Sequence, residues 1–346
     1  MNRLLDRGVL VRGTVILALL LVALFALPAW FDTSWIDTFT SVAIYAVVSA
    51  GLVVLYGKVG MISLGQFALL AVGTWTGLRL NYLVDLPFPL LLLATGAVTC
   101  VVGVVIGLPA LRLSGLFLAL ITLMGAGAIT LVLRTLEFPN GGGGFSGHRD
   151  SDLGGVVPMV RPSWGTSEVG FYRYTVIVCA LVFLLALAHF VLKPGRAWAA
   201  IRESEPAALA AGVNITLYKL WAFALASFMT GVAGCLLASQ VGQTTPQPFL
   251  LTNNLLLIAT AMIGGIFTLW GAVVAGVMAK LVPFFLQTEW GVGQYWLTIL
   301  FGVGMLQVLL TAPGGIAQQL PKDLANLGRL IVRPFRKPPS ASEEST

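Results

Sequence analysis

Residues 171–238 contain two long apolar runs separated by a charged stretch. The sequence reads FYRYTVIVCALVFLLALAHFVL over 171–192, GRAWAAIRESEPAALAAGVNITLYKLWAF over 195–223 and ALASFMTGVAGCLLA over 224–238. The apolar runs approach or exceed the roughly 20 residues that a helix needs to cross the core of a bilayer. This stretch therefore predicts two membrane-spanning helices joined by a charged loop.

The whole chain has the composition of a protein that is solvated by lipid. Of its 346 residues, 58% are hydrophobic and only 10% are charged, whereas a soluble globular protein has about 25% charged residues. We expect an all-α, polytopic membrane protein with about ten transmembrane helices and short cytoplasmic helices in the charged loop. The expected crossings are residues 12–30, 36–56, 61–80, 87–110, 114–134, 171–193, 217–240, 250–266, 270–286 and 292–312.

The basic residues predict the orientation, because cytoplasmic segments carry an excess of Lys and Arg. With the N-terminus in the cytoplasm, nine basic residues up to position 219 and five after position 320 fall on that side, which is 14 of the 20. Both termini are then cytoplasmic. The first apolar run is about 18 residues long, which favours a retained helix over a cleaved signal peptide. The opposite side is expected to hold Arg79, Arg134, Arg149, Arg161, Arg173 and Lys280.

Several classes of function are disfavoured by what the sequence lacks. The basic residues gather at segment ends rather than in one patch, which excludes nucleic acid as a partner. No Asp or Glu lies in the middle of an expected crossing, whereas proton-coupled carriers place such groups there. No catalytic constellation, nucleotide-binding motif or metal-ligand spacing is present, so we expect no enzyme activity, no cofactor and no metal.

The charged loop is expected to form two short helices on the cytoplasmic face. Pro194 and Gly195 end the preceding crossing, so the first short helix should cover 196–203. Ser204 is a good N-cap for the second helix, and Gly212 should end it. The two short helices (196–212) carry as many acids as bases, whereas helices that rest on lipid headgroups favour Lys and Arg. A docking surface for a partner protein fits that balance better.

The charged loop also resembles a segment of a known family. GRAWAAIRESEPAALAAGVNITLYKLWAFALASFMTGVAG is similar to the cytoplasmic loop of permease subunits in ATP-binding-cassette (ABC) importers of the high-affinity branched-chain amino acid family. In that family this loop couples the permease to the ATPase. The resemblance implies coupling positions at Arg196, Ala197, Ile201, Arg202, Glu203, Ala207, Ala208, Gly212, Asn214 and Lys219, with Glu203 the first choice for a direct contact.

Two further stretches carry the same resemblance. GLVVLYGKVGMISLGQFALLAVGTW (51–75) matches through Ser63, Gly65 and Gln66, and LRLSGLFLALITLMGAGAI (111–129) matches through Thr122. We expect these four residues to line a translocation pathway or gate. Counted along a helix from Lys58, Ser63 and Gln66 lie only about 8–12 Å deep, which favours an inner gate or a helix-packing role over the main substrate site.

The resemblance implies the remaining organisation. Residues 1–316 would be the transmembrane permease domain, with a coupling loop at 195–219 and an external loop at 135–170, and residues 317–346 a cytoplasmic tail that is disordered beyond about 333. The partners would be two ABC ATPase subunits, a second, related permease (a heterodimer, with a homodimer as the alternative), an extracytoplasmic solute-binding protein and the lipid of a bacterial plasma membrane.

The substrate is expected to be a branched-chain amino acid or another small neutral or zwitterionic solute, because a pathway without fixed charge offers no counter-ion for a strongly charged one. A urea or short-amide ABC permease is the alternative. A stand-alone secondary carrier and a membrane enzyme are the rival classes.

Overall fold

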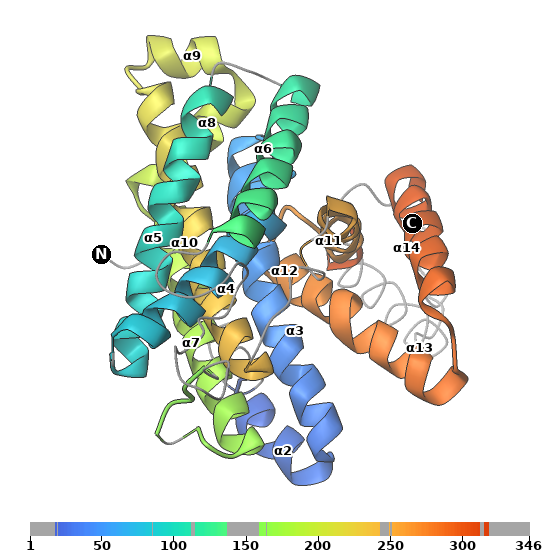
Figure 1. The fold of residues 1–346 in the computed structure, drawn as a ribbon. Coiled ribbons are helices and arrows are strands. Elements are labelled where there is room, and N and C mark those ends of the chain that lie inside the picture. Colours follow the sequence, from blue (N-terminus) through green and yellow to red (C-terminus); the bar gives the residue numbers. More distant parts are fainter. Residues whose placement is uncertain are drawn as a thin grey trace, which may run out of the picture.

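The computed structural model of the chain describes residues 18, 20–84, 86–111, 115–136, 159–163, 165–242, 249, 251–311 and 315–317. The described residues form helices joined by turns and short non-helical segments, and none of them forms a strand (Figure 1). The α-helices are α2 (Leu27–Trp30), α3 (Thr33–Leu52), α4 (Gln66–Leu83), α5 (Phe88–Ala110), α6 (Gly115–Thr135), α7 (Glu168–Val191), α8 (Lys193–Glu203), α9 (Glu205–Ala210), α10 (Ile215–Val241), α11 (Leu251–Gly264), α12 (Leu269–Gly276), α13 (Val282–Trp290) and α14 (Gln294–Thr311). The π-helical segments are η2 (Val22–Ala26), η3 (Val53–Val59) and η5 (Val277–Leu281).

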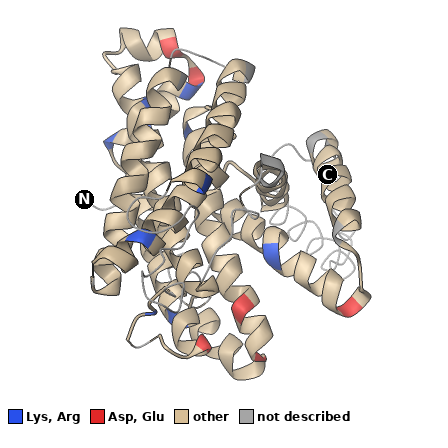
Figure 2. Cartoon of the chain, in the orientation of Figure 1, with Lys and Arg blue, Asp and Glu red and all other residues tan. Residues whose placement is uncertain are grey.

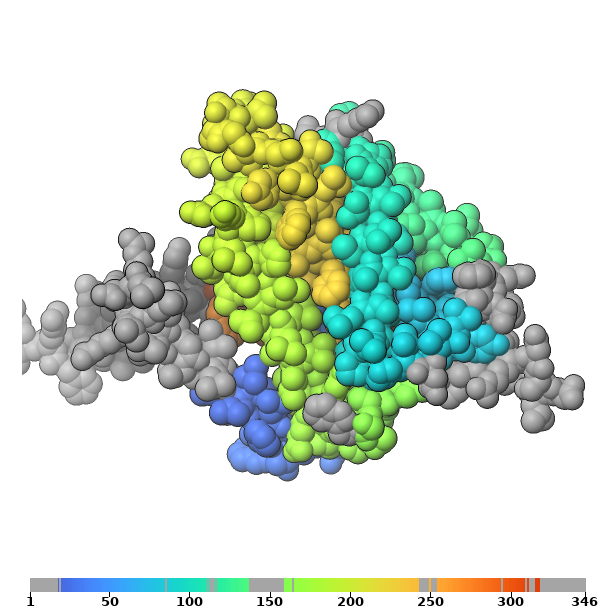
Figure 3. Space-filling model, turned by 90° about the vertical axis from the view of Figure 1, so that its left-hand side faces the viewer, coloured from blue at the N-terminus to red at the C-terminus, as the bar shows by residue number. Residues whose placement is uncertain are grey.

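Helices α3 and α10 form the centre of the bundle. In each of these two helices, 78% of an apolar 18-residue stretch is buried. The same share is 22–39% in the other membrane-length helices of the described chain. Helix α10 packs against α3, α4 and α5, whereas α3 packs against α7 and α12. Figure 3 shows α7, α10 and α5 beside one another on one face of the molecule. The helices around this pair therefore present apolar side chains outward, as lipid requires.

Small residues bring α4 unusually close to α10. A Cβ atom added to Gly73 would lie 2.8 Å from the Cα atom of Gly231, and one added to Gly234 would lie 2.7 Å from the Leu70 carbonyl oxygen. Membrane helices use small residues in this way, because close backbone approach maximises packing where lipid removes the hydrophobic driving force. This crossing fixes the N-terminal half of α4 against the centre of the bundle.

Six helices of the described residues are long and apolar enough to cross a membrane. They are Thr33–Val59, Phe88–Pro109, Phe117–Thr135, Glu168–Val191, Ile215–Val241 and Leu269–Trp290. Two shorter apolar helices, Asn254–Gly264 and Tyr295–Val308, lie where the eighth and tenth crossings were expected. The chain is an all-α, multi-pass membrane protein, but the expected count of ten crossings is not confirmed.

The third expected crossing, 61–80, begins later than predicted. Residues 60–65 are not helical, and α4 begins only at Gln66. Gly60 ends η3 in the left-handed backbone region, with a φ of 84°. Hydropathy has the same value in an extended and in a helical apolar segment, so it could not reveal this break. Ser63 and Gly65 therefore lie in front of a helix rather than inside it.

Residues 250–286, expected to form two crossings, form one short helix and one long one. Helix α11 has 14 residues, or about 21 Å of length, which is less than the thickness of a bilayer core of about 30 Å. By contrast, α12, η5 and α13 form one helical run from Leu269 to Trp290. The two helices meet closely at a turn, where the glycines allow backbone contact between Gly264 and Gly271.

Lys280 lies in the middle of this long helical run, and its expected external position is wrong. It comes eleven residues after Leu269 and ten before Trp290, or about 16 Å from either end. The external position was expected because successive loops alternate between the two sides of a membrane. Such alternation does not distinguish a Lys in a loop from a Lys inside a crossing. A positive charge therefore stands near the middle of a helix that is long and apolar enough to cross a membrane, whereas a pathway without fixed charge was expected.

Other expectations concern residues outside the described parts. The Gly-rich section of the external loop (137–158), most of the 243–250 segment and the tail beyond 317 lie there. Within the described parts, Cys100, Cys179 and Cys235 are free thiols inside apolar helices, where a free Cys behaves as a small hydrophobic residue.

Candidate functional site

The charged stretch folds as two short helices, α8 and α9, that cover one end of the bundle (Figures 1 and 3). Helix α8 begins three residues before the predicted Arg196, because Pro194 fits the first turn of a helix. Ser204 has an extended backbone, with a φ of −161° and a ψ of 115°. Its Oγ accepts a hydrogen bond from the Ala207 amide at 3.4 Å. Ser204 therefore ends α8 and caps α9, as predicted.

The second short helix ends where the sequence indicates. Gly212 adopts a φ of 80°, which disfavours residues with a side chain. Asn214 then starts α10, since its Oδ1 accepts a hydrogen bond from the Leu217 amide at 3.1 Å. Local capping chemistry thus sets both ends of α9 and the beginning of α10.

Trp198 anchors α8 to the bundle. Its side chain is fully buried, and its Nε1 donates a hydrogen bond to the Tyr218 carbonyl at 2.8 Å. The His189 ring stacks on it with 6.4 Å between ring centroids. Ile201 and Ala208 are buried as well. These residues therefore fix the two helices in place, so Ile201 and Ala208, which the resemblance gave as coupling positions, face the bundle.

An ion pair joins α9 to α10. The Nζ atom of Lys219 lies 2.7 Å from Oε1 of Glu205, and their side chains are 9% and 48% exposed. A nearly buried ammonium needs a counter-charge, and Glu205 supplies it. Lys219 and Glu205 therefore hold the loop together and offer little charge to a partner.

The outward side of α8 and α9 mixes both charges with small and apolar residues. Glu203, Ala207 and Asn214 are exposed, and Leu209 is 63% exposed. Figure 2 shows acidic and basic residues together at this end of the molecule. We call this outward side the α8–α9 surface, formed by Arg196, Arg202, Glu203, Ala207, Leu209, Gly212 and Asn214.

Arg202 belongs to this surface and also reaches into the bundle. Its Nη1 donates a hydrogen bond to the Gly57 carbonyl in η3, and its guanidinium lies over the Phe267 ring, 4.9 Å from the centroid. Gly57 lies near the end of the α3–η3 helix, and Phe267 comes just before α12. One side chain of α8 therefore contacts both the end of the α3–η3 run and the turn just before α12.

Three of the four predicted gate residues meet at the break in front of α4. The Leu64 amide donates a hydrogen bond to Oγ1 of Thr122 at 2.9 Å, and the Gly65 amide donates to Oγ of Ser63 at 3.4 Å. Thr122 in turn donates to the Ala119 carbonyl at 2.9 Å. The polar groups that a non-helical segment leaves unpaired are thus partly satisfied by α6.

Gln66, the fourth, points to the centre of the bundle. Its Nε2 donates to Oγ1 of Thr230, and the side chain is 1% exposed. Next to it, the Phe67 amide donates to Oδ1 of Asn254 at 2.9 Å. Asn254 is also 1% exposed. This polar layer joins α4, α10 and α11, and Asn254 is a member that the sequence did not identify.

A family model described as the branched-chain amino acid transport system / permease component matches residues 34–309. That range includes α8, α9 and the break in front of α4. The chain belongs to this family. It is therefore a permease component of a membrane transport system, in agreement with the resemblance of its three motifs.

Curated relatives of the permease support the assignment. It is 30% identical over 257 residues to the high-affinity branched-chain amino acid transport system permease protein LivM of Salmonella typhimurium, and 29% identical over 257 residues to that of Escherichia coli. Each match covers 69% of this chain and 60% of the relative, so the permease spans about 60% of the length of these relatives. No solved structure matches it.

Proposed function

We propose that the permease is a translocation subunit of an ATP-driven ABC importer, and that the α8–α9 surface is where an ATPase subunit docks. The observation that carries the proposal is Arg202, which belongs to this surface and contacts Gly57 and Phe267. A partner that moves α8 would pull on the ends of two long helical runs at once. Because ATP hydrolysis needs a nucleotide site and the sequence has no such motif, the energy would come from the partner.

The rigid attachment of α8 and α9 suits this role. A loop that transmits a displacement has to be attached rigidly to the helices that it moves. Trp198 and the Lys219–Glu205 pair attach α8 and α9 to α10. The exposed carboxylate of Glu203 is free of any ion pair with the described basic residues. We assign Glu203 as a direct contact with the ATPase, since an exposed carboxylate without an ion pair can pair with a complementary charge on the partner.

The substrate and the assembly are part of the same proposal. The two relatives are named as branched-chain amino acid permeases, which supports branched-chain amino acids as the cargo, with urea or a short amide as the alternative. Two ATPases, a second permease and an external solute-binding protein would complete the importer in the plasma membrane. Both termini would be cytoplasmic, on the same side as the α8–α9 surface.

Replacement of Glu203 by alanine tests the docking site. Truncation of an interface anchor costs about 1–2 kcal/mol, so Glu203→Ala should weaken ATPase binding roughly 5- to 30-fold and lower transport-linked ATP hydrolysis. The measurement is co-purification of the ATPase with the membrane-inserted permease, together with substrate uptake.

Glu289→Ala is the matched control, because Glu289 is an exposed carboxylate at the end of α13. It should leave both readouts unchanged. Normal ATPase recruitment and uptake by Glu203→Ala would remove Glu203 from the interface.

A further inference from the structure

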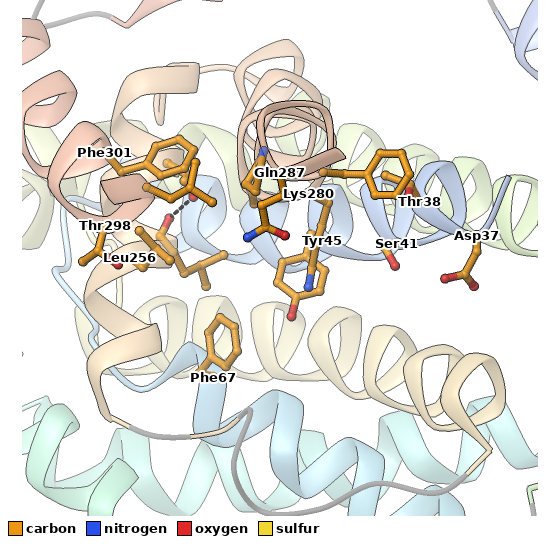
Figure 4. Close-up of a pocket in the computed structure, with 16 residues that line it drawn as sticks. Asp37, Thr38, Ser41, Tyr45, Phe67, Leu256, Lys280, Gln287, Thr298 and Phe301 are labelled. Carbon is orange, nitrogen blue, oxygen red and sulfur yellow. Dashed lines mark hydrogen bonds between the residues drawn. The ribbon is translucent and has the colours of Figure 1, made fainter. Parts of the chain in front are cut away.

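A cavity of about 370 Å³ lies between α3, the start of α4, α11, the η5–α13 run and α14 (Figure 4). It is separate from the α8–α9 surface and from the break in front of α4. Pockets for small molecules range from about 300 to 1,000 Å³, so this one is suited to a compact solute. Its walls come from helices far apart in the sequence, an arrangement that membrane proteins use for binding sites.

Lys280 is the basic group among the residues that line this cavity. Its Nζ lies 4.1 Å from the centroid of the Tyr45 ring, and Figure 4 shows the two side chains facing one another. No ion pair joins Lys280 to a carboxylate of the described residues. An ionisable residue near the middle of a membrane-length helix is costly and generally serves an ion or substrate. The aromatic ring compensates for only part of that cost.

The cavity has a polar part and an apolar part. Ser41, Gln287 and Lys280 bring polar groups to one part, which extends toward Asp37. Phe67 and Phe301 bring aromatic rings to the other part, where Thr298 also lies, as Figure 4 shows. Further apolar lining comes from Leu256, Leu257 and Leu297. A small ligand with a negative group at one end and an apolar group at the other would match Lys280 and these rings.

We infer that Lys280 binds the carboxylate of an α-amino acid whose apolar side chain lies toward Phe67 and Phe301. This inference rests on the proposed transport function and names the residue that recognises the carboxylate of the cargo. A carboxylate bound by an ammonium in a poorly hydrated cavity forms a charge-assisted hydrogen bond, stronger than a neutral one. Urea and short amides carry no charge and would leave Lys280 without a counter-ion.

Asp37, which also lines the cavity, is not part of the same binding position. It lies eight residues before Tyr45 on α3, about 12 Å along the helix, whereas the two charged groups of an α-amino acid are only a few bonds apart. Its Oδ1 already accepts a hydrogen bond from Nε2 of Gln240 at 2.8 Å. The carboxylate, and not the ammonium, is therefore the group that this position recognises.

The test is equilibrium binding of radiolabelled leucine to the complex of this permease with its partner subunits in lipid nanodiscs. Loss of a charge-assisted hydrogen bond should weaken binding about 10- to 100-fold in Lys280→Met, while Lys280→Arg, which keeps the charge, should retain more affinity. Unlabelled isoleucine should displace leucine, and leucinamide, which lacks the carboxylate, should not. Arg134→Met is the matched control, because Arg134 is an exposed cation on α6 outside the cavity.

Three outcomes would overturn the inference: wild-type affinity in Lys280→Met, displacement by leucinamide as effective as by isoleucine, or no leucine binding to the wild-type complex. Substrate uptake and ATP hydrolysis by the same complex are measured separately. If uptake and ATP hydrolysis persist although leucine does not bind, the importer assignment is retained and only the assignment of Lys280 as a binding residue is rejected. Should Lys280→Met not insert into the membrane, Lys280→Arg and the leucinamide competition still decide.

Discussion

At the scale of single residues, one hydroxyl holds the break in front of α4. Thr122 accepts the hydrogen bond of the Leu64 amide at 2.9 Å. In Thr122→Val the amide keeps its surroundings but loses its partner, which costs about 1–3 kcal/mol when the donor is buried. Hydrogen exchange at Leu64 should accelerate and uptake should fall, because segment 60–65 loosens.

Thr122→Ser keeps the acceptor and should behave like the wild type. Thr130→Val is a second control, since the hydroxyl of Thr130 bonds only carbonyls of its own helix in the described structure. Unchanged exchange at Leu64 in Thr122→Val would show that this hydrogen bond does not hold the segment.

Residue-scale prediction from sequence succeeds where the chemistry is local. Ser204 and Asn214 cap the helices that directly follow them, so neighbouring residues suffice to assign them. Asn254 and Lys280 could not be placed in this way. Asn254 is buried because α11 passes the start of α4, and Lys280 faces Tyr45 from a helix far along the chain. Both contacts depend on tertiary packing, although a lone Lys in an apolar run was a usable signal.

At the scale of helices, the contact of α4 with α10 depends on the absence of side chains. A methyl group at Gly73 would lie 2.8 Å from Gly231, so Gly73→Ala should force the two helices apart and destabilise the fold by about 1–3 kcal/mol. Thermal unfolding of the purified permease measures this loss. Gly125→Ala is the matched control, because a Cβ atom there meets nothing within 4 Å and alanine favours the helix. Equal stability of the two variants would contradict the close crossing.

The helical elements themselves were predictable to different degrees. Long apolar runs such as α7 and α10 follow from hydropathy alone, and α8 and α9 follow from Pro194, Ser204 and Gly212. The non-helical segment 60–65 could not be predicted, because its residues are as apolar as those of a helix. The shortness of α11 was not evident either, because the apolar sequence continues past its end.

At the scale of the whole molecule, the α8–α9 surface and the cavity are connected through two helical runs. Arg202 contacts Gly57, near the end of the run that carries Tyr45, and Phe267, just before the run that carries Lys280. A displacement of α8 would therefore reach both walls of the cavity. In the proposal, the partner's binding energy therefore biases one arrangement of these helices over another.

The most direct test of this account is ATP-dependent uptake of radiolabelled leucine into proteoliposomes that contain the complete importer, with and without the ATPase subunits. The account predicts uptake that requires both ATP and the ATPase and is blocked by isoleucine. Uptake at the same rate after the ATPase subunits are omitted would contradict it, because the permease would then be a secondary carrier that needs no partner at the α8–α9 surface.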